Sequence, residues 1–131
     1  MATQVQKLEN HFPQRILQVD GILELCLGAG LVLDAQAIAG WLGLSTPAIE
    51  IGGIFALAFG AVLLYMAQRN ANRNLLQIVA VLNIAFIALT AAVLALDWNM
   101  FANEGRWLLA LVVDVFLVVG LVEYYARRFV A

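Results

Sequence analysis

The interiors of the long apolar runs of this chain contain no basic residue, and charge of either sign is scarce throughout. Its 131 residues include 7 Lys and Arg, 9 Asp and Glu and one His, so 12% are charged and the net charge is −2. A soluble domain is about a quarter charged and about half apolar. This chain is 64% hydrophobic with a mean hydropathy of +0.92. The composition predicts an integral membrane protein and argues against a nucleic-acid partner.

Cysteine and histidine occur once each. The single cysteine, Cys26, excludes an intramolecular disulfide and a CxxC redox site, and we interpret it as a small buried hydrophobic residue. The single histidine, His11, lies outside the apolar runs. The chain also lacks a nucleotide-binding loop, an HExxH motif and a Cys/His metal set. We therefore expect no metal, no cofactor and no enzymatic activity.

Four apolar runs are long enough to cross a hydrocarbon core of ~30 Å, which requires ~20 helical residues. They cover residues 14–33, 48–67, 75–96 and 106–126. Open sheets cannot satisfy their backbone in lipid, and the runs lack the alternation of barrel strands. The predicted fold is a single all-α transmembrane domain, 1–131, in which two antiparallel hairpins form a four-helix bundle.

A short N-terminal interfacial helix is predicted before the first span. Within residues 3–12, Val5, Leu8 and Phe12 share one helical face, which is typical of a helix lying on a membrane surface. Pro13 follows at a position where a new helix can begin without losing a needed N–H.

The basic residues predict the orientation of the spans. Six of the seven fall on one side of a four-span arrangement: Lys7, Arg15, Arg69, Arg73, Arg127 and Arg128. Only Arg106 falls on the other side. Because loops rich in Lys and Arg stay in the cytoplasm, we expect both termini to be cytoplasmic.

Three carboxylic acids lie inside the apolar runs with no basic partner there: Asp20, Glu24 and Asp114. An ionised carboxylate in hydrocarbon is costly, so such residues are rarely present without a role. At about 1.5 Å per residue, Glu24, Asn83 and Asp114 fall at a similar depth near the membrane midplane. We predict a polar cluster of these three residues, with Asp20 one turn away on the face that carries Glu24.

This cluster has three interpretations. It is a hydrogen-bonded structural element with protonated acids, a site that handles protons or cations, or a contact with another subunit. Glu123 is predicted to lie outside it, as a surface residue paired with Arg127 one turn later.

Small residues predict where helices approach closely, because packing in lipid depends on them. Gly52, Ala56 and Gly60 are spaced by four residues in the second span, and Gly21 and Gly28 share the acidic face of the first span. A further small-residue stripe in the third span consists of Ala88, Ala92 and Ala95. These stripes indicate either contacts within the bundle or an interface with a partner.

The chain resembles small bacterial integral membrane proteins with four helices. The resemblance rests on Val19-Asp20-Gly21, Gln68-Arg69 and Leu82-Asn83. It implies a multi-pass protein of the bacterial inner membrane. The cytoplasmic location of both termini is predicted separately, from the distribution of Lys and Arg. Nothing functional is carried over from the resemblance. From the composition and size of the chain, we expect as partners the lipid bilayer and either further copies of the chain or a larger membrane complex.

Three functions are consistent with these patterns. The leading hypothesis is a non-enzymatic helix bundle that serves as an accessory, assembly or interaction subunit. The second is a proton- or cation-coupled carrier of small molecules that uses Glu24 and Asp114, with Asp20 as a relay. The third is a binder of lipid or another apolar ligand between glycine-lined helices.

Overall fold

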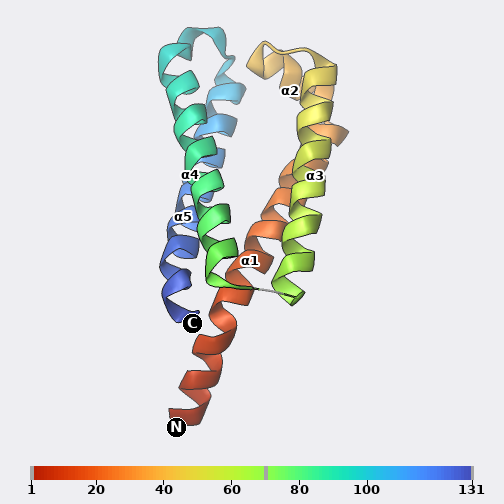
Figure 1. Cartoon of the computed structure of the whole chain (residues 1–131). Helices are drawn as coiled ribbons and strands as arrows, with labels where there is room; N and C mark the ends of the chain where they lie inside the picture. The colour runs from red at the N-terminus through yellow and green to blue at the C-terminus, as the bar shows by residue number, and fades with distance from the viewer. Residues whose placement is uncertain (1, 70, 131) are drawn as a thin grey trace.

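Figure 1 shows the computed structural model, in which long helices form two antiparallel hairpins. The structure describes the backbone of residues 2–69 and 71–130, and the side chains of residues 11–69 and 71–130. The elements in chain order are α1 (Ala2–Leu33), α2 (Ala35–Leu42), α3 (Thr46–Arg69), α4 (Arg73–Leu96), the short helix η1 (Trp98–Met100), α5 (Asn103–Ala126) and η2 (Arg127–Phe129). Helix α1 pairs with α3, and α4 pairs with α5.

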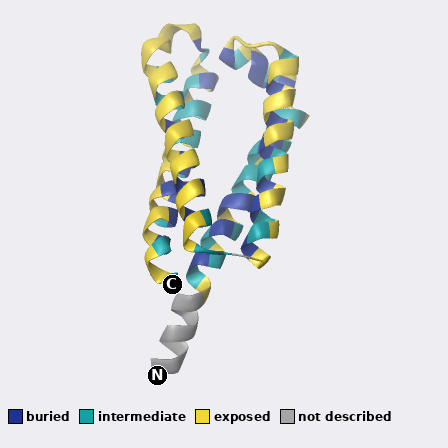
Figure 2. Ribbon diagram, viewed as in Figure 1, coloured by how far each residue is buried: buried dark blue, intermediate teal, exposed yellow. Residues whose placement is uncertain are grey.

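Four helical segments of the described chain are long and apolar enough to cross a membrane. They are His11–Leu33, Thr46–Arg69, Arg73–Leu96 and Asn103–Phe129. Each contains one of the spans predicted from the sequence, so the four long apolar helices are confirmed. Many large apolar side chains are exposed, and Phe55 is 75% exposed. The exposed residues are coloured yellow on the ribbon in Figure 2. A bilayer would cover this surface, since soluble proteins rarely expose large continuous apolar patches.

The N-terminal helix is not separate from the first span. Helix α1 continues from Ala2 to Leu33 with Pro13 inside it, so the prediction of a distinct short helix that ends before Pro13 is wrong. Proline removes one backbone N–H from a helix interior. Here that loss falls near the start of the apolar span, His11–Leu33. The expected apolar face includes Val5 and Leu8, whose side chains lie outside the described residues.

Glycines set the close approach of α1 and α3. A methyl group on Gly60 would lie 2.7 Å from the carbonyl oxygen of Gly21, and one on Gly28 would lie 2.7 Å from the carbonyl oxygen of Gly53. Both distances are too short for a real side chain. The two helices therefore meet backbone to backbone at two levels, which is the packing that small residues permit in lipid.

The small-residue stripe of α3 runs through Gly53, not through Gly52 as the sequence pattern suggested. Nothing lies within 4 Å of a methyl group placed on Gly52, and Gly52 is exposed. Ala56 and Gly60 are buried as expected. Residues seven apart in a helix return almost to the same angle, whereas a spacing of four drifts by about 40° at each step. Gly53 and Gly60 therefore share one seam.

The two hairpins meet at both ends of the bundle. We call one end the arginine end, because it carries Arg15, Arg69, Arg73, Arg127 and Arg128. At this end α1 begins, α3 leads into α4, and the chain ends (Figure 1). At this end all four long helices contribute to one buried apolar cluster, made of Leu17, Leu63, Ala67, Leu76, Val79 and Ala126. At the opposite end, Phe101 packs with buried residues of α2, and the N–H of Ala102 donates to the carbonyl oxygen of Trp41 at 2.9 Å.

Candidate polar cluster between the hairpins

Three buried polar side chains from three helices form a hydrogen-bonded cluster. The Nδ2 atom of Asn83 on α4 donates to Oδ2 of Asp20 on α1 at 2.9 Å and to Oε2 of Glu123 on α5 at 3.0 Å. An asparagine amide carries two N–H bonds, so each acid receives one of them. The cluster thereby joins the first hairpin to both helices of the second.

The cluster lies one helical turn from the apolar cluster of the arginine end. Asp20 follows buried Leu17 by three residues, and Asn83 follows buried Val79 by four. Residues three or four apart in a helix lie on the same face. The apolar residues that bring the hairpins together therefore also direct these polar side chains toward one another.

Gly120 brings α5 close to α4 beside the amide. A methyl group on Gly120 would lie 3.4 Å from Cβ of Asn83 and 3.4 Å from Cγ1 of Ile84. This spacing leaves room for little more than a glycine or alanine. Because Glu123 lies three residues after Gly120, the close approach places its carboxyl group within reach of Asn83.

Burial of the cluster is nearly complete. Asp20 and Glu123 are 0% exposed and Asn83 is 4% exposed. The second oxygens of the two acids, Oδ1 of Asp20 and Oε1 of Glu123, have no hydrogen-bond partner within the described part of the chain. The two carboxyl groups are nevertheless neighbours, because both are hydrogen-bonded to the same atom, Nδ2 of Asn83.

This arrangement can hold one proton. No Lys, Arg or His lies among the buried residues of the described chain, so no base offsets the acids. Two buried carboxylates without a counter-charge are strongly unfavourable, and such groups become neutral instead. A proton between Asp20 and Glu123 would remove one of the two charges and give both unpartnered oxygens a role.

Glu24 lies beside the cluster, without a hydrogen bond to the described residues. It follows Asp20 by one turn of α1 and is close enough for the charges of the two acids to interact. Its side chain is half-buried, and a methyl group on Gly60 would lie 3.0 Å from its Cβ. Glu24 is therefore the most accessible acid near the cluster.

The structure does not bring Asp114 to Asn83. Asp114 is exposed on α5, whereas Phe116, Gly120 and Glu123 belong to the buried face of that helix. Nine residues separate Asp114 from Glu123, which is about half a rotation out of register at 3.6 residues per turn. The two acids therefore lie on opposite faces, and the expected cluster of Glu24, Asn83 and Asp114 is not the one that forms.

Two interpretations of single residues are also wrong. Glu123 is buried and does not form a surface pair with Arg127, which instead donates to Oε1 of Gln77 at 3.2 Å. The sequence did contain a signal for the burial of Glu123. Gly120 precedes Glu123 by three residues, so the two share the face of α5 that packs closely against α4. Cys26 is exposed on the outside of α1 rather than buried.

Comparison with known proteins identifies no relative. No family model matches the chain, and neither a curated protein nor a solved structure is detectably similar. In the described residues, no group of three or more His, Cys, Asp and Glu side chains is arranged to hold a metal ion. The functional argument therefore depends on the geometry of the cluster.

Proposed function

We propose that this protein is a non-enzymatic helix bundle of the bacterial inner membrane that acts as an accessory, assembly or interaction subunit. The observation that carries the proposal is the complete burial of Asp20 and Glu123 around Asn83. Both acids accept hydrogen bonds from the Asn83 amide, so the cluster joins α1 and α5 to α4. Such a cluster specifies how two hairpins dock, which is a structural role for buried polar groups in membranes.

Burial also argues against the simplest carrier mechanism. An acid that takes up and releases protons or cations needs contact with water from at least one side of the membrane. Asp20 and Glu123 have no exposed surface. Asp114, the other acid of the carrier hypothesis, lies apart on the exposed face of α5.

The outer surface supports an interaction role. Ala88, Ala92 and Ala95 are all exposed on α4, so they do not serve packing within the bundle. Helices associate in lipid through small residues that permit close approach. A partner helix from a second copy or another membrane protein would fit such a face.

Transport activity provides the direct test. The full chain is reconstituted into liposomes that contain a pH-sensitive dye, and a proton or cation gradient is imposed. We expect the flux to equal that of empty liposomes, with an ionophore added last to show that the gradient persists. Flux that depends on the protein, and that Glu24→Gln abolishes, would replace this proposal with the carrier.

Association provides the second test. The oligomeric state of the full chain is measured by single-molecule photobleaching in liposomes over a range of protein-to-lipid ratios. If the chain self-associates through α4, Ala92→Leu should lower the associated fraction, whereas Ala61→Leu on the exposed surface of α3 should not. Equal effects of the two variants would remove the α4 face as the interface.

The proposal places both termini in the cytoplasm. Arg69, Arg73, Arg127 and Arg128 lie at the arginine end, and the described positive charge at the opposite end is Arg106. Lys and Arg near span ends are retained on the cytoplasmic side. A C-terminal reporter that is active only in the cytoplasm should be active, and activity of a periplasmic reporter would reverse the orientation.

A second candidate function, proton or cation handling, is favoured by one observation. Glu24 is half-buried, and its charge interacts with that of Asp20. It could pass a proton between the outside and the pair of unpartnered carboxyl oxygens. Loss of flux in Glu24→Gln, with retained flux in Asp114→Asn, would support this candidate.

A further inference from the structure

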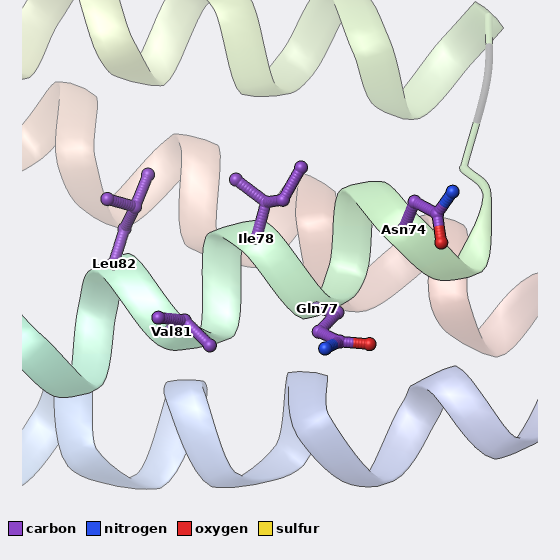
Figure 3. Close-up of a pocket in the computed structure, with 5 residues that line it drawn as sticks. All are labelled: Asn74, Gln77, Ile78, Val81 and Leu82. Carbon is purple, nitrogen blue, oxygen red and sulfur yellow. The ribbon is translucent and has the colours of Figure 1, made fainter.

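A groove of about 400 Å³ lies along the part of α4 nearest the arginine end, away from the polar cluster. It is lined by Asn74, Gln77, Ile78, Val81 and Leu82, which all project from α4 (Figure 3). The lining is polar at one end and apolar at the other. Asn74 and Gln77 lie near the first turn of the helix, and the three aliphatic residues follow deeper in the span.

Arginines surround the polar end of the groove. Nη1 of Arg127 donates to Oε1 of Gln77 at 3.2 Å, and the guanidinium carbon lies 3.7 Å from the centre of the Tyr124 ring. These two contacts hold the Arg127 side chain beside the groove. Arg73 precedes Gln77 by four residues, so it lies on the same face of α4, and it is exposed.

Among the residues whose side chains the structure describes, the accessible charge of this end is positive. Its described arginines are Arg15, Arg69, Arg73, Arg127 and Arg128. The described acids nearest to it, Asp20 and Glu123, are fully buried and cannot neutralise a ligand site at the surface. An anionic group is therefore the complementary partner.

The groove also fits the depth of a lipid. Asn74 to Leu82 spans about 12 Å along a helix axis, and half of a hydrocarbon core is about 15 Å. Its polar end lies at the first turn of an apolar span, the level at which lipid headgroups sit. Its apolar end extends to the depth of the acyl chains.

We propose that this groove binds one phospholipid with a negatively charged headgroup. Arg127 and Arg73 hold the phosphate, and the Gln77 amide, which already accepts from Arg127, donates an N–H to the headgroup. One acyl chain lies along Ile78, Val81 and Leu82. This proposal does not rest on the proposed accessory function, since the groove occupies the part of α4 nearest the arginine end, whereas Ala88, Ala92 and Ala95 lie further along the same face.

The test measures lipid retention by native mass spectrometry of the full chain, released from mixed micelles that contain equal amounts of phosphatidylglycerol and phosphatidylcholine. We expect phosphatidylglycerol to be retained preferentially. Arg127→Gln should reduce that retention about fivefold, which is the effect of one basic residue at an anionic membrane surface. The fold of each variant is checked by circular dichroism and thermal unfolding.

Arg106→Gln is the matched control. Arg106 is also a boundary arginine stacked on an aromatic ring, at 4.9 Å from the centre of Trp98, but it lies at the opposite end of the bundle. It should leave phosphatidylglycerol retention unchanged. Equal losses in Arg127→Gln and Arg106→Gln would mean that charge alone attracts the lipid, and would overturn a site at α4.

Two further variants test the groove itself. Val81→Trp fills its apolar part without changing charge, and should lower retention of phosphatidylglycerol; unchanged retention would overturn the proposed position of the acyl chain. Ile78→Cys, in a Cys26→Ser background, tests occupation by a second copy of the chain. Rapid disulfide-linked dimerisation through Ile78→Cys in liposomes would assign the groove to that copy and overturn the lipid proposal.

Discussion

Asp20 on α1 and Glu123 on α5 accept hydrogen bonds from the same atom, the Nδ2 of Asn83 on α4. One amide group therefore connects the two hairpins, which otherwise meet mainly through apolar contacts at their ends. Because both acids are fully buried, no water from the surface can replace the lost bonds if the amide is removed. The stability of hairpin docking should depend strongly on this side chain.

Replacing Asn83 by Leu should loosen the docking of the hairpins. The substitution keeps a similar volume but leaves two buried acids without their donor, at an expected cost of about 1–3 kcal/mol in the free energy of unfolding. The measurement is unfolding of the full chain in mixed micelles of increasing denaturing detergent. Thr90→Ala is the control, because Thr90 bonds only to the carbonyl of Phe86 in its own helix. Equal stability of wild type and Asn83→Leu would contradict a docking role.

The register of the first hairpin can be tested with neighbouring glycines. Gly53→Ala should destabilise the protein by about 1–3 kcal/mol, because its methyl group would lie 2.9 Å from the carbonyl oxygen of Gly28. Gly52→Ala should be neutral or slightly stabilising, since the position is open and alanine favours helix. The two variants are compared by the same detergent unfolding. The reverse order of stability would indicate that α3 is rotated to present Gly52 to α1.

The sequence was sufficient to predict the four long apolar helices and to place Asp20 and Asn83 at or beside a polar cluster. Long apolar runs in lipid allow only helices, and a polar residue within them needs a partner. The sequence did not identify which acid of α5 lies beside Asn83, because the depth of a residue in the membrane does not define which way its helix is rotated. Asp114 matched Asn83 in depth but faces outward, whereas Glu123 faces inward beside Gly120. Helix rotation depends on close packing between helices, which a single apolar chain encodes only weakly.

The pair of acids predicts different effects for a neutral polar and an apolar substitution. Glu123→Gln keeps a polar group that can bond both to Asn83 and to Asp20, so we expect a change in unfolding free energy below about 1 kcal/mol. Glu123→Leu removes these bonds and leaves Asp20 as an isolated buried acid, with an expected loss of about 1–3 kcal/mol. Asp114→Leu, on the exposed face of the same helix, is the control and should not destabilise. Similar losses in Glu123→Gln and Glu123→Leu would argue against the hydrogen-bonded pair.

The contact of Gly120 with Asn83 should limit the size of the side chain that position 120 can carry. Gly120→Leu would push α5 away from Asn83 and Ile84, and it should destabilise the protein by about 1–3 kcal/mol. Spin labels on α1 and α5 would report whether the hairpins separate as well. Gly30→Leu is the control, because nothing lies within 4 Å of a methyl group at Gly30. No change in either stability or label distance for Gly120→Leu would contradict the close approach of α4 and α5.

The most direct test of the account is infrared spectroscopy of the carboxyl groups in liposomes. A proton held between Asp20 and Glu123 in a closed site predicts a protonated-carboxyl band at neutral pH that is lost in the double variant Asp20→Asn/Glu123→Gln and retained in Asp114→Asn. After transfer to D₂O, this band should shift only slowly, because the pair has no exposed surface. An absent band, or one that shifts as soon as D₂O is added, would contradict the account, because it would mean that the cluster is ionised or open to water.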